Sequence, residues 1–113
     1  MIVIVTGGRS YANVEKLNTV FDELHSKEPI SLLIEGGAQG ADRLARNWAV
    51  NNNVSYLTVH ARWNQFGKSA GFIRNQAMIE MRHDIVIAFP GGKGTAGMVK
   101  LARNKGSKLM EVM

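Results

Sequence analysis

Short runs of apolar residues alternate along this chain with segments that repeat at helical spacing. The runs are continuous, which is typical of strands buried on both faces of a parallel sheet. They span residues 2–5, 31–34, 55–59 and 85–89, with a weaker fifth run at 109–112. This alternation predicts an α/β fold: a single Rossmann-like, doubly wound, mainly parallel sheet of about five strands flanked by helices.

The segments between these runs carry the helical period. In the first, Asn13 is a predicted N-cap and Val14, Leu17, Phe21 and Leu24 share one face. The others are marked by Ala41, Leu44, Ala45 and Trp48, by Ile73, Ala77 and Met81, and by Val99 and Ala102 before Gly106. Trp48 therefore belongs to the predicted core. Residues 61–67 fit neither pattern, and we expect a loop there at the carboxyl edge of the sheet.

Length and composition exclude several classes of protein. The 113 residues suit one domain, residues 1–113. The absence of cysteine excludes disulfides, cysteine zinc sites and a cysteine nucleophile. His25, His60 and His83 lie far apart, so we expect no metal site and no resident cofactor. Without an apolar run near membrane length or a signal peptide, we expect a cytoplasmic protein of a bacterium or phage.

The charge balance favours anionic partners. The net charge is +5, and the isoelectric point is near 9.9. Such an excess suits nucleotides, nucleic acids or acidic surfaces, although it also serves solubility alone. Composition by itself does not choose between these interpretations.

Three glycine-rich stretches follow predicted strands, at residues 6–10, 35–42 and 90–95. In a parallel sheet these stretches meet at the carboxyl edge, where ligands bind. Glycine lets backbone N–H groups approach an anion, and the following helix adds the positive end of its dipole. Arg9 or Lys93 would add charge, and Thr95 a hydroxyl. A single stretch could serve a tight turn only, but three equivalent ones predict a phosphate site.

Two common nucleotide motifs are absent from these stretches. Residues 91–95 lack the Gly-Lys-Ser/Thr ending of an NTPase P-loop. No Gly-x-Gly-x-x-Gly follows the first strand, and no acidic residue stands where a dinucleotide ribose would require one. The chain is also too short for the substrate domain of a usual dehydrogenase.

A basic pair surrounds another predicted helix start. Lys68 and Arg74 lie six residues apart, and Arg74 falls about one turn into that helix. Its guanidinium could form bidentate hydrogen bonds to a phosphate or ribose, although most arginines are simply solvated. Asn75 is a poor helix-interior residue, which indicates a specific hydrogen bond. Trp63 and Phe66 are candidates to stack on a base, to plug the top of the sheet or to form a dimer contact.

These motifs together resemble the YspA-like branch of the SLOG superfamily, the DprA/LOG Rossmannoid group. The resemblance rests on residues 36–42, Trp63, residues 67–71, Arg74-Asn75 and residues 89–95. It covers nearly the whole chain and implies a Rossmannoid fold and a nucleotide or nucleotide-derived ligand. The Gly-Gly-x-Gly-Thr element alone is shared across the superfamily.

In the LOG branch, similar motifs belong to phosphoribohydrolases, which cleave the N-glycosidic bond of a nucleoside monophosphate. The resemblance implies that Arg74 lines the site and that a glutamate follows Thr95 by three residues. This chain has Met98 there, which removes a carboxylate suited to an oxocarbenium-like centre. Glu35 and Asp42 are the predicted substitutes, and Asp42 also complements a helix dipole.

Three functions follow as hypotheses. The first is binding of a nucleotide-like small molecule, as a signal sensor or sponge. The second is a LOG-like N-glycosidic hydrolase with Arg74 and Glu35 as catalytic residues. The third is DprA-like single-stranded DNA binding. The predicted ligand-binding residues are Gly7, Gly8, Arg9, Gly36, Gly37, Gly40, Asp42, Trp63, Lys68, Arg74, Asn75, Gly91, Gly92, Gly94 and Thr95. A homodimer through Met78, Ile79 and Met81 is a further hypothesis, and we expect no membrane partner.

Overall fold

A computed structural model describes residues 1–113 and shows one sheet of five parallel strands. The strands are β1 (Ile2–Thr6), β2 (Leu32–Glu35), β3 (Ser55–Thr58), β4 (Ile85–Ala88) and β5 (Leu109–Glu111). They lie in the order β3-β2-β1-β4-β5, so β1 is central and pairs with β2 and β4. The parallel order confirms the predicted Rossmann-like α/β fold.

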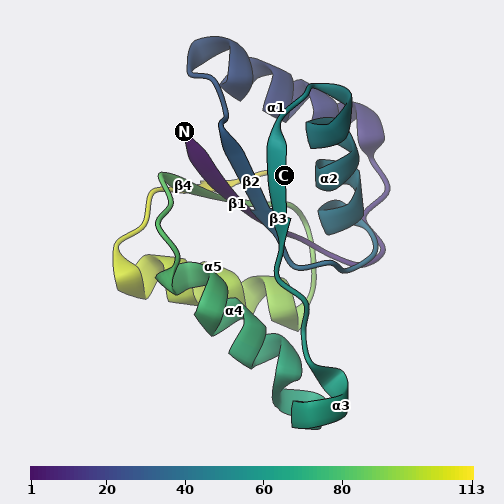
Figure 1. The fold of residues 1–113 in the computed structure, drawn as a ribbon, viewed down its shortest axis with the longest axis vertical. Coiled ribbons are helices and arrows are strands. Elements are labelled where there is room, and N and C mark those ends of the chain that lie inside the picture. The colour runs from purple at the N-terminus through teal and green to yellow at the C-terminus, as the bar shows by residue number, and fades with distance from the viewer.

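Two pairs of helices cover the two faces of the sheet (Figure 1). The pairs are α1 (Val14–Lys27) with α2 (Ala41–Asn51), and α4 (Ala70–Glu80) with α5 (Lys93–Lys105). A short helix, α3 (Trp63–Phe66), and a 3-10 turn at Gly67–Ser69 precede α4. None of these helices has the length and apolar character needed to cross a membrane.

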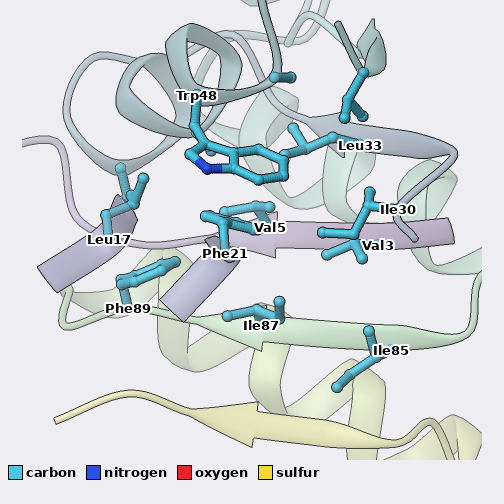
Figure 2. Packing of buried hydrophobic residues seen from close by; sticks show 14 residues of the cluster. Val3, Val5, Leu17, Phe21, Ile30, Leu33, Trp48, Ile85, Ile87 and Phe89 are labelled. Carbon is cyan, nitrogen blue, oxygen red and sulfur yellow. The ribbon is translucent and has the colours of Figure 1, made fainter. Parts of the chain in front are cut away.

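The larger core lies between the sheet and the α1/α2 pair. Phe21 of α1 stacks on Trp48 of α2 with ring centroids 5.1 Å apart, and Phe89 closes the same layer (Figure 2). The indole Nε1 of Trp48 donates a 2.9 Å hydrogen bond to Asp22. A stacked aromatic pair adds to the free energy of burial. The prediction that Trp48 belongs to the core is confirmed.

The smaller core lies under α4 and α5. Ile4, Ile34 and Val86 of the sheet pack there against Met78 and Ile79. Both of these residues are almost fully buried in one chain. The hypothesis that Met78, Ile79 and Met81 form an uncovered dimer face is therefore wrong for the first two, because the sheet already covers them.

The predicted helix ends are confirmed. The side chain of Asn13 accepts a 3.1 Å hydrogen bond from the backbone N–H of Lys16, as an N-cap does. Gly106 ends α5 in the left-handed conformation, with φ 79°. Val99 and Ala102 are buried on the inner face of that helix, also as predicted.

Three expectations fail, each for a physical reason. β3 is an edge strand, so Tyr56 and Leu57 are exposed rather than buried on both faces. Residues 61–67 are not a plain loop, because Trp63–Phe66 forms one helical turn. In α4 the stripe of Ile73, Ala77 and Met81 is not the buried face. The face of α4 that meets the sheet instead carries Asn75, Met78 and Ile79, so the apolar spacing of four marked a different face of the helix.

Candidate functional site

A cavity of about 560 Å³ opens at the carboxyl edge of the sheet. The chain leaves β1 toward α1 on one face and leaves β4 toward α5 on the other. Neighbouring strands that diverge in this way create a crevice, which is the usual ligand site of open α/β sheets. The volume falls within the range of small-molecule pockets.

Most of the predicted ligand-binding residues line this cavity. They are Gly7, Gly8, Arg9, Gly36, Asp42, Trp63, Lys68, Arg74, Asn75, Gly92, Gly94 and Thr95. The predicted residues Glu35, Gly37, Gly40 and Gly91 lie outside the lining. The structure thus brings together residues as far apart in the chain as Gly7 and Thr95, as a shared sheet edge predicts.

The lining also contains residues that sequence reasoning did not select as site residues: Val5, Thr6, Ala38, Gly71, Phe72, Met78, Lys93 and Gly97. Lys93 and Gly71 belonged to recognised motifs, and Thr6 ends β1 at the same edge. The motifs around these three residues therefore already indicated the carboxyl edge of the sheet. That Phe72 and Gly97 face the cavity follows only from how α4 and α5 are turned in the fold.

One group of glycines holds the loops of the edge together. We call Gly7, Gly8, Gly40 and Gly91 the closed glycines. A Cβ at Gly7 would lie 2.5 Å from the Cβ of Ala41, and a Cβ at Gly40 would collide with the carbonyl oxygen of Gly8. Gly40 also has φ 73°, which side chains rarely adopt. These glycines therefore have a complete packing explanation.

The backbone of the closed glycines connects three loops. The N–H of Gly8 donates to the carbonyl of Pro90 over 2.9 Å. The carbonyl of Gly8 accepts from the N–H groups of Ala41 and Tyr11, both at 3.2 Å. These bonds tie the loop after β1 to the loop after β4 and to the start of α2. They form a rigid floor beside the cavity.

A second group of glycines has no packing explanation. We call Gly92, Gly94 and Gly97 the open glycines, because a Cβ at any of them would meet no atom within 4 Å. None has a positive φ. All three line the cavity along the start of α5. Gly94 and Gly97 lie inside the helix, where glycine costs roughly 0.5–1 kcal/mol relative to alanine, so another requirement keeps this surface bare.

The start of α5 presents unpaired donors to the cavity. No protein group accepts a hydrogen bond from the backbone N–H of Lys93, Gly94 or Thr95. N-cap Gly92 offers no side-chain acceptor. These N–H groups and the positive end of the helix dipole form an environment that binds anions.

Arg74 is held over the cavity by two hydrogen bonds. Its Nη1 donates to the carbonyl of Gly36 over 2.6 Å, and its Nε donates to Oδ1 of Asn75 over 2.8 Å. Burial lowers the pKa of Arg74 from its ordinary value, while nearby Asp42 acts in the opposite direction. The side-chain amide of Asn75 donates to the carbonyl of Gly94 over 3.3 Å. Buried Asn75 thus links Arg74 to the start of α5.

Asp42 is the single carboxylate in the cavity lining. Its residue is only 6% exposed, and its Oδ2 accepts a 3.2 Å hydrogen bond from the N–H of Ala38. Burial, with a smaller contribution from the charge of Glu35, raises the pKa of Asp42 from 3.8 to about 6, against the opposing effects of that hydrogen bond and of Arg74. A carboxyl group with this pKa exchanges a proton near neutral pH.

Glu35 has a different position from Asp42. It is fully buried at the end of β2, outside the cavity lining. Its Oε1 accepts a 2.7 Å bond from the N–H of Gly37, and its Oε2 accepts from the hydroxyl of Thr58. Both oxygens therefore stabilise the loop after β2 and its junction with β3. This geometry makes Glu35 a support of the site rather than a group in contact with a ligand.

The side chain at position 98 points away from the cavity. Met98 is fully buried in the smaller core with Ile4 and Val86. Gly97, the residue before it, lines the cavity instead. The carboxylate that the LOG resemblance implies is thus absent, and no other acidic residue of α5 takes its place.

Basic side chains dominate the charge of the lining. Arg9, Lys68, Arg74 and Lys93 surround the cavity, against Asp42 alone. The guanidinium carbon of Arg9 lies 5.5 Å from the ring centroid of Trp63. No cluster of three His, Asp or Glu side chains with metal-binding geometry is present anywhere in the chain. The lining of the cavity is therefore predominantly positive.

Comparison with known proteins agrees with this fold and motif set. The family described as YspA, cpYpsA-related SLOG (YAcAr) matches residues 1–66. The chain belongs to this family. The SLOG chain is also similar to the Gene 61 protein of Mycobacterium phage D29, with 33% identity over 112 residues, 92% of this chain and 90% of that protein. No solved protein structure gives a significant match.

Proposed function

We propose that this SLOG-family chain binds a nucleotide or nucleotide-derived small molecule, with its phosphate at the start of α5. The observation that carries the proposal is the surface of open glycines, Gly92, Gly94 and Gly97, which no packing contact explains. A ligand that approaches the backbone closely requires such a surface. The unpaired N–H groups beside it are donors for phosphate oxygens.

The remaining lining supports the same ligand class. Four basic side chains match a phosphate-bearing molecule, and Arg74 is fixed where it can bind two oxygens at once. Asp42 is placed as an acceptor for a ribose hydroxyl. A sensor or sponge requires only these contacts and no chemical step.

A second candidate is hydrolysis of the N-glycosidic bond. The observation that favours it is Asp42, a cavity carboxyl group with a pKa of about 6 next to Arg74. Such a group could protonate a leaving base or orient water. Buried Met98 and the engaged oxygens of Glu35 count against the LOG arrangement. In this second candidate Asp42 replaces Glu35 as the catalytic acid.

The third hypothesis, single-stranded DNA binding, has less support. Of the four cations from Lys100 to Lys108, on and just after the second half of α5, two are paired: Arg103 with Glu111 at 2.7 Å and Lys105 with Glu80 at 3.0 Å. An electrostatic groove for a backbone needs free cations along an exposed path. We therefore rank it below small-molecule binding.

A thermal-shift screen tests the proposal. The purified chain is heated with nucleoside monophosphates, NAD, ADP-ribose and cyclic nucleotides, and each stabilising ligand is then examined by chromatography. A ligand at a hundred times its Kd stabilises by about 2.7 kcal/mol, which raises Tm by several degrees. An intact ligand supports a sensor, and free base with sugar phosphate supports the hydrolase. No shift by any compound contradicts the proposal.

The variant Arg74→Ala sharpens this test. Because Arg74 is positioned by Gly36 and Asn75, we expect its loss to weaken ligand binding by at least tenfold, the lower end for a charge-assisted bidentate contact, about 1.4 kcal/mol. The control is Arg43→Ala, which removes the same charge from an exposed position on α2 outside the lining. If the two variants bind the ligand with equal affinity, Arg74 does not contact the ligand.

A further inference from the structure

An exposed indole forms part of the cavity wall. Trp63 keeps 48% of its surface exposed, whereas Trp48, the other tryptophan, is 3% exposed in the core. Trp63 comes from the four-residue helix α3, which also carries Phe66. Phe66 is exposed as well but lies outside the lining, so α3 turns one of its two aromatic side chains toward the cavity.

The position of the indole is defined by two contacts. At its edge, a Cβ on Gly71 of α4 would lie 3.4 Å from Cη2 of Trp63, so the ring rests over a residue without a side chain. Over its face lies the guanidinium of Arg9, with 5.5 Å between its carbon and the ring centroid. One flat face of the indole thus lies against a planar cation, and the residue as a whole remains half exposed.

We propose that this face of Trp63 is the stacking surface for the base of the ligand and that Arg9 covers it until the base arrives. An exposed cation–π contact is weaker than base–aromatic stacking, so a planar base can displace the guanidinium. Arg9 also lines the cavity, where it is then free to pair with a phosphate. Trp63 therefore determines the preference for a nucleotide over a sugar phosphate.

This inference rests on the proposed function, but the two can be tested independently. The phosphate contacts come from the start of α5, whereas stacking comes from α3. Ribose 5-phosphate probes the first set alone. The four nucleoside 5′-monophosphates AMP, GMP, CMP and UMP probe both sets.

The test is a titration of wild type, Trp63→Ala, Trp63→Phe and Phe66→Ala with these five compounds. We expect at least one monophosphate to bind wild type more tightly than ribose 5-phosphate does. Trp63→Ala should weaken the binding of that monophosphate by about five- to 150-fold and leave the affinity for ribose 5-phosphate unchanged. Trp63→Phe should retain most of the affinity, and the matched control Phe66→Ala all of it.

Tryptophan fluorescence gives a second readout. Since Trp48 is buried, the monophosphate should quench the emission of Trp63, and ribose 5-phosphate should not. The quenching should disappear in Trp63→Phe although that variant still binds. If Trp63→Ala and Phe66→Ala bind the monophosphate equally, or if ribose 5-phosphate binds as tightly as every monophosphate, the stacking role is overturned. If no compound binds, the proposed function fails with it.

Discussion

The closed and open glycines lie at the same sheet edge but in opposite surroundings. At the closed glycines, such as Gly40, a side chain would collide with the backbone of a neighbouring loop. At the open glycines, such as Gly97, a side chain would enter empty space inside the cavity. The closed group builds the floor of the site, and the open group keeps its wall bare. One residue type therefore has a packing role in one region and, in our proposal, a role in ligand recognition in the other.

The largest expected effect belongs to Gly40→Ala. The added methyl group would meet the carbonyl of Gly8 at a φ of 73°, so both sterics and conformation oppose it. We expect a loss of about 3–5 kcal/mol in the free energy of unfolding, and a fall in Tm above about 10 °C. Thermal melts followed by circular dichroism measure this. If Gly40→Ala is no less stable than the control Gly92→Ala, the closed group is not structural.

The next effect concerns Asp42, which lies in the first turn of α2 and lines the cavity. Burial raises its pKa from 3.8 to about 6 in the folded chain. Between about pH 4 and pH 6 the unfolded chain binds fewer protons than the folded one, so stability falls as pH rises and then levels off. The total fall is on the order of 3 kcal/mol.

The variant Asp42→Asn tests that pH dependence. An amide oxygen still accepts from the N–H of Ala38, but the side chain no longer ionises. We expect the slope between pH 4 and pH 6 to flatten and the variant to exceed wild type in stability at pH 7. Urea midpoints across this range measure it, with Glu23→Gln on the exposed side of α1 as control. An unchanged slope would assign the pH dependence to other groups.

The smallest change in stability is expected at the open glycines. Gly97→Ala places a methyl group in the cavity and improves helix propensity, so the chain should gain up to roughly 1 kcal/mol in stability. Ligand affinity should nevertheless fall at least tenfold if the ligand contacts this backbone. Tm and titration with the ligand found in the screen measure the two effects. Unchanged affinity would mean that the ligand does not contact Gly97.

The sheet was predictable because its strands are short and mostly apolar, and because three of them, β1, β2 and β4, are followed by glycine. Trp48 and Gly106 also kept their predicted roles, since helix period and cap chemistry are local properties. The exposed edge position of β3 was not predictable, because an apolar run does not reveal its neighbours in the sheet. The buried face of α4 was missed for a similar reason: Asn75, a polar residue, lies on it.

The location of the site was predictable, but the roles of its individual residues were not. Glycine-rich stretches after three strands indicate the carboxyl edge, and most of their residues line the cavity. Whether Gly40 meets a backbone and Gly97 meets open space depends on contacts between distant loops. For the same reason, the sequence did not distinguish the role of Glu35 from that of Asp42. Both are acids near one edge, and only the fold shows which of them lies in the lining.

The central position of β1 has a consequence for synthesis of the chain. β1 is made first but has β2 on one side and β4, some eighty residues later, on the other. While the second half is still missing, Ile4 and Ile34 lack the helices that later cover them. The cavity needs both Gly7 and Gly97. During synthesis β1, β2 and β3 can therefore pair early, whereas the lining of the cavity stays incomplete until Gly97 has been made.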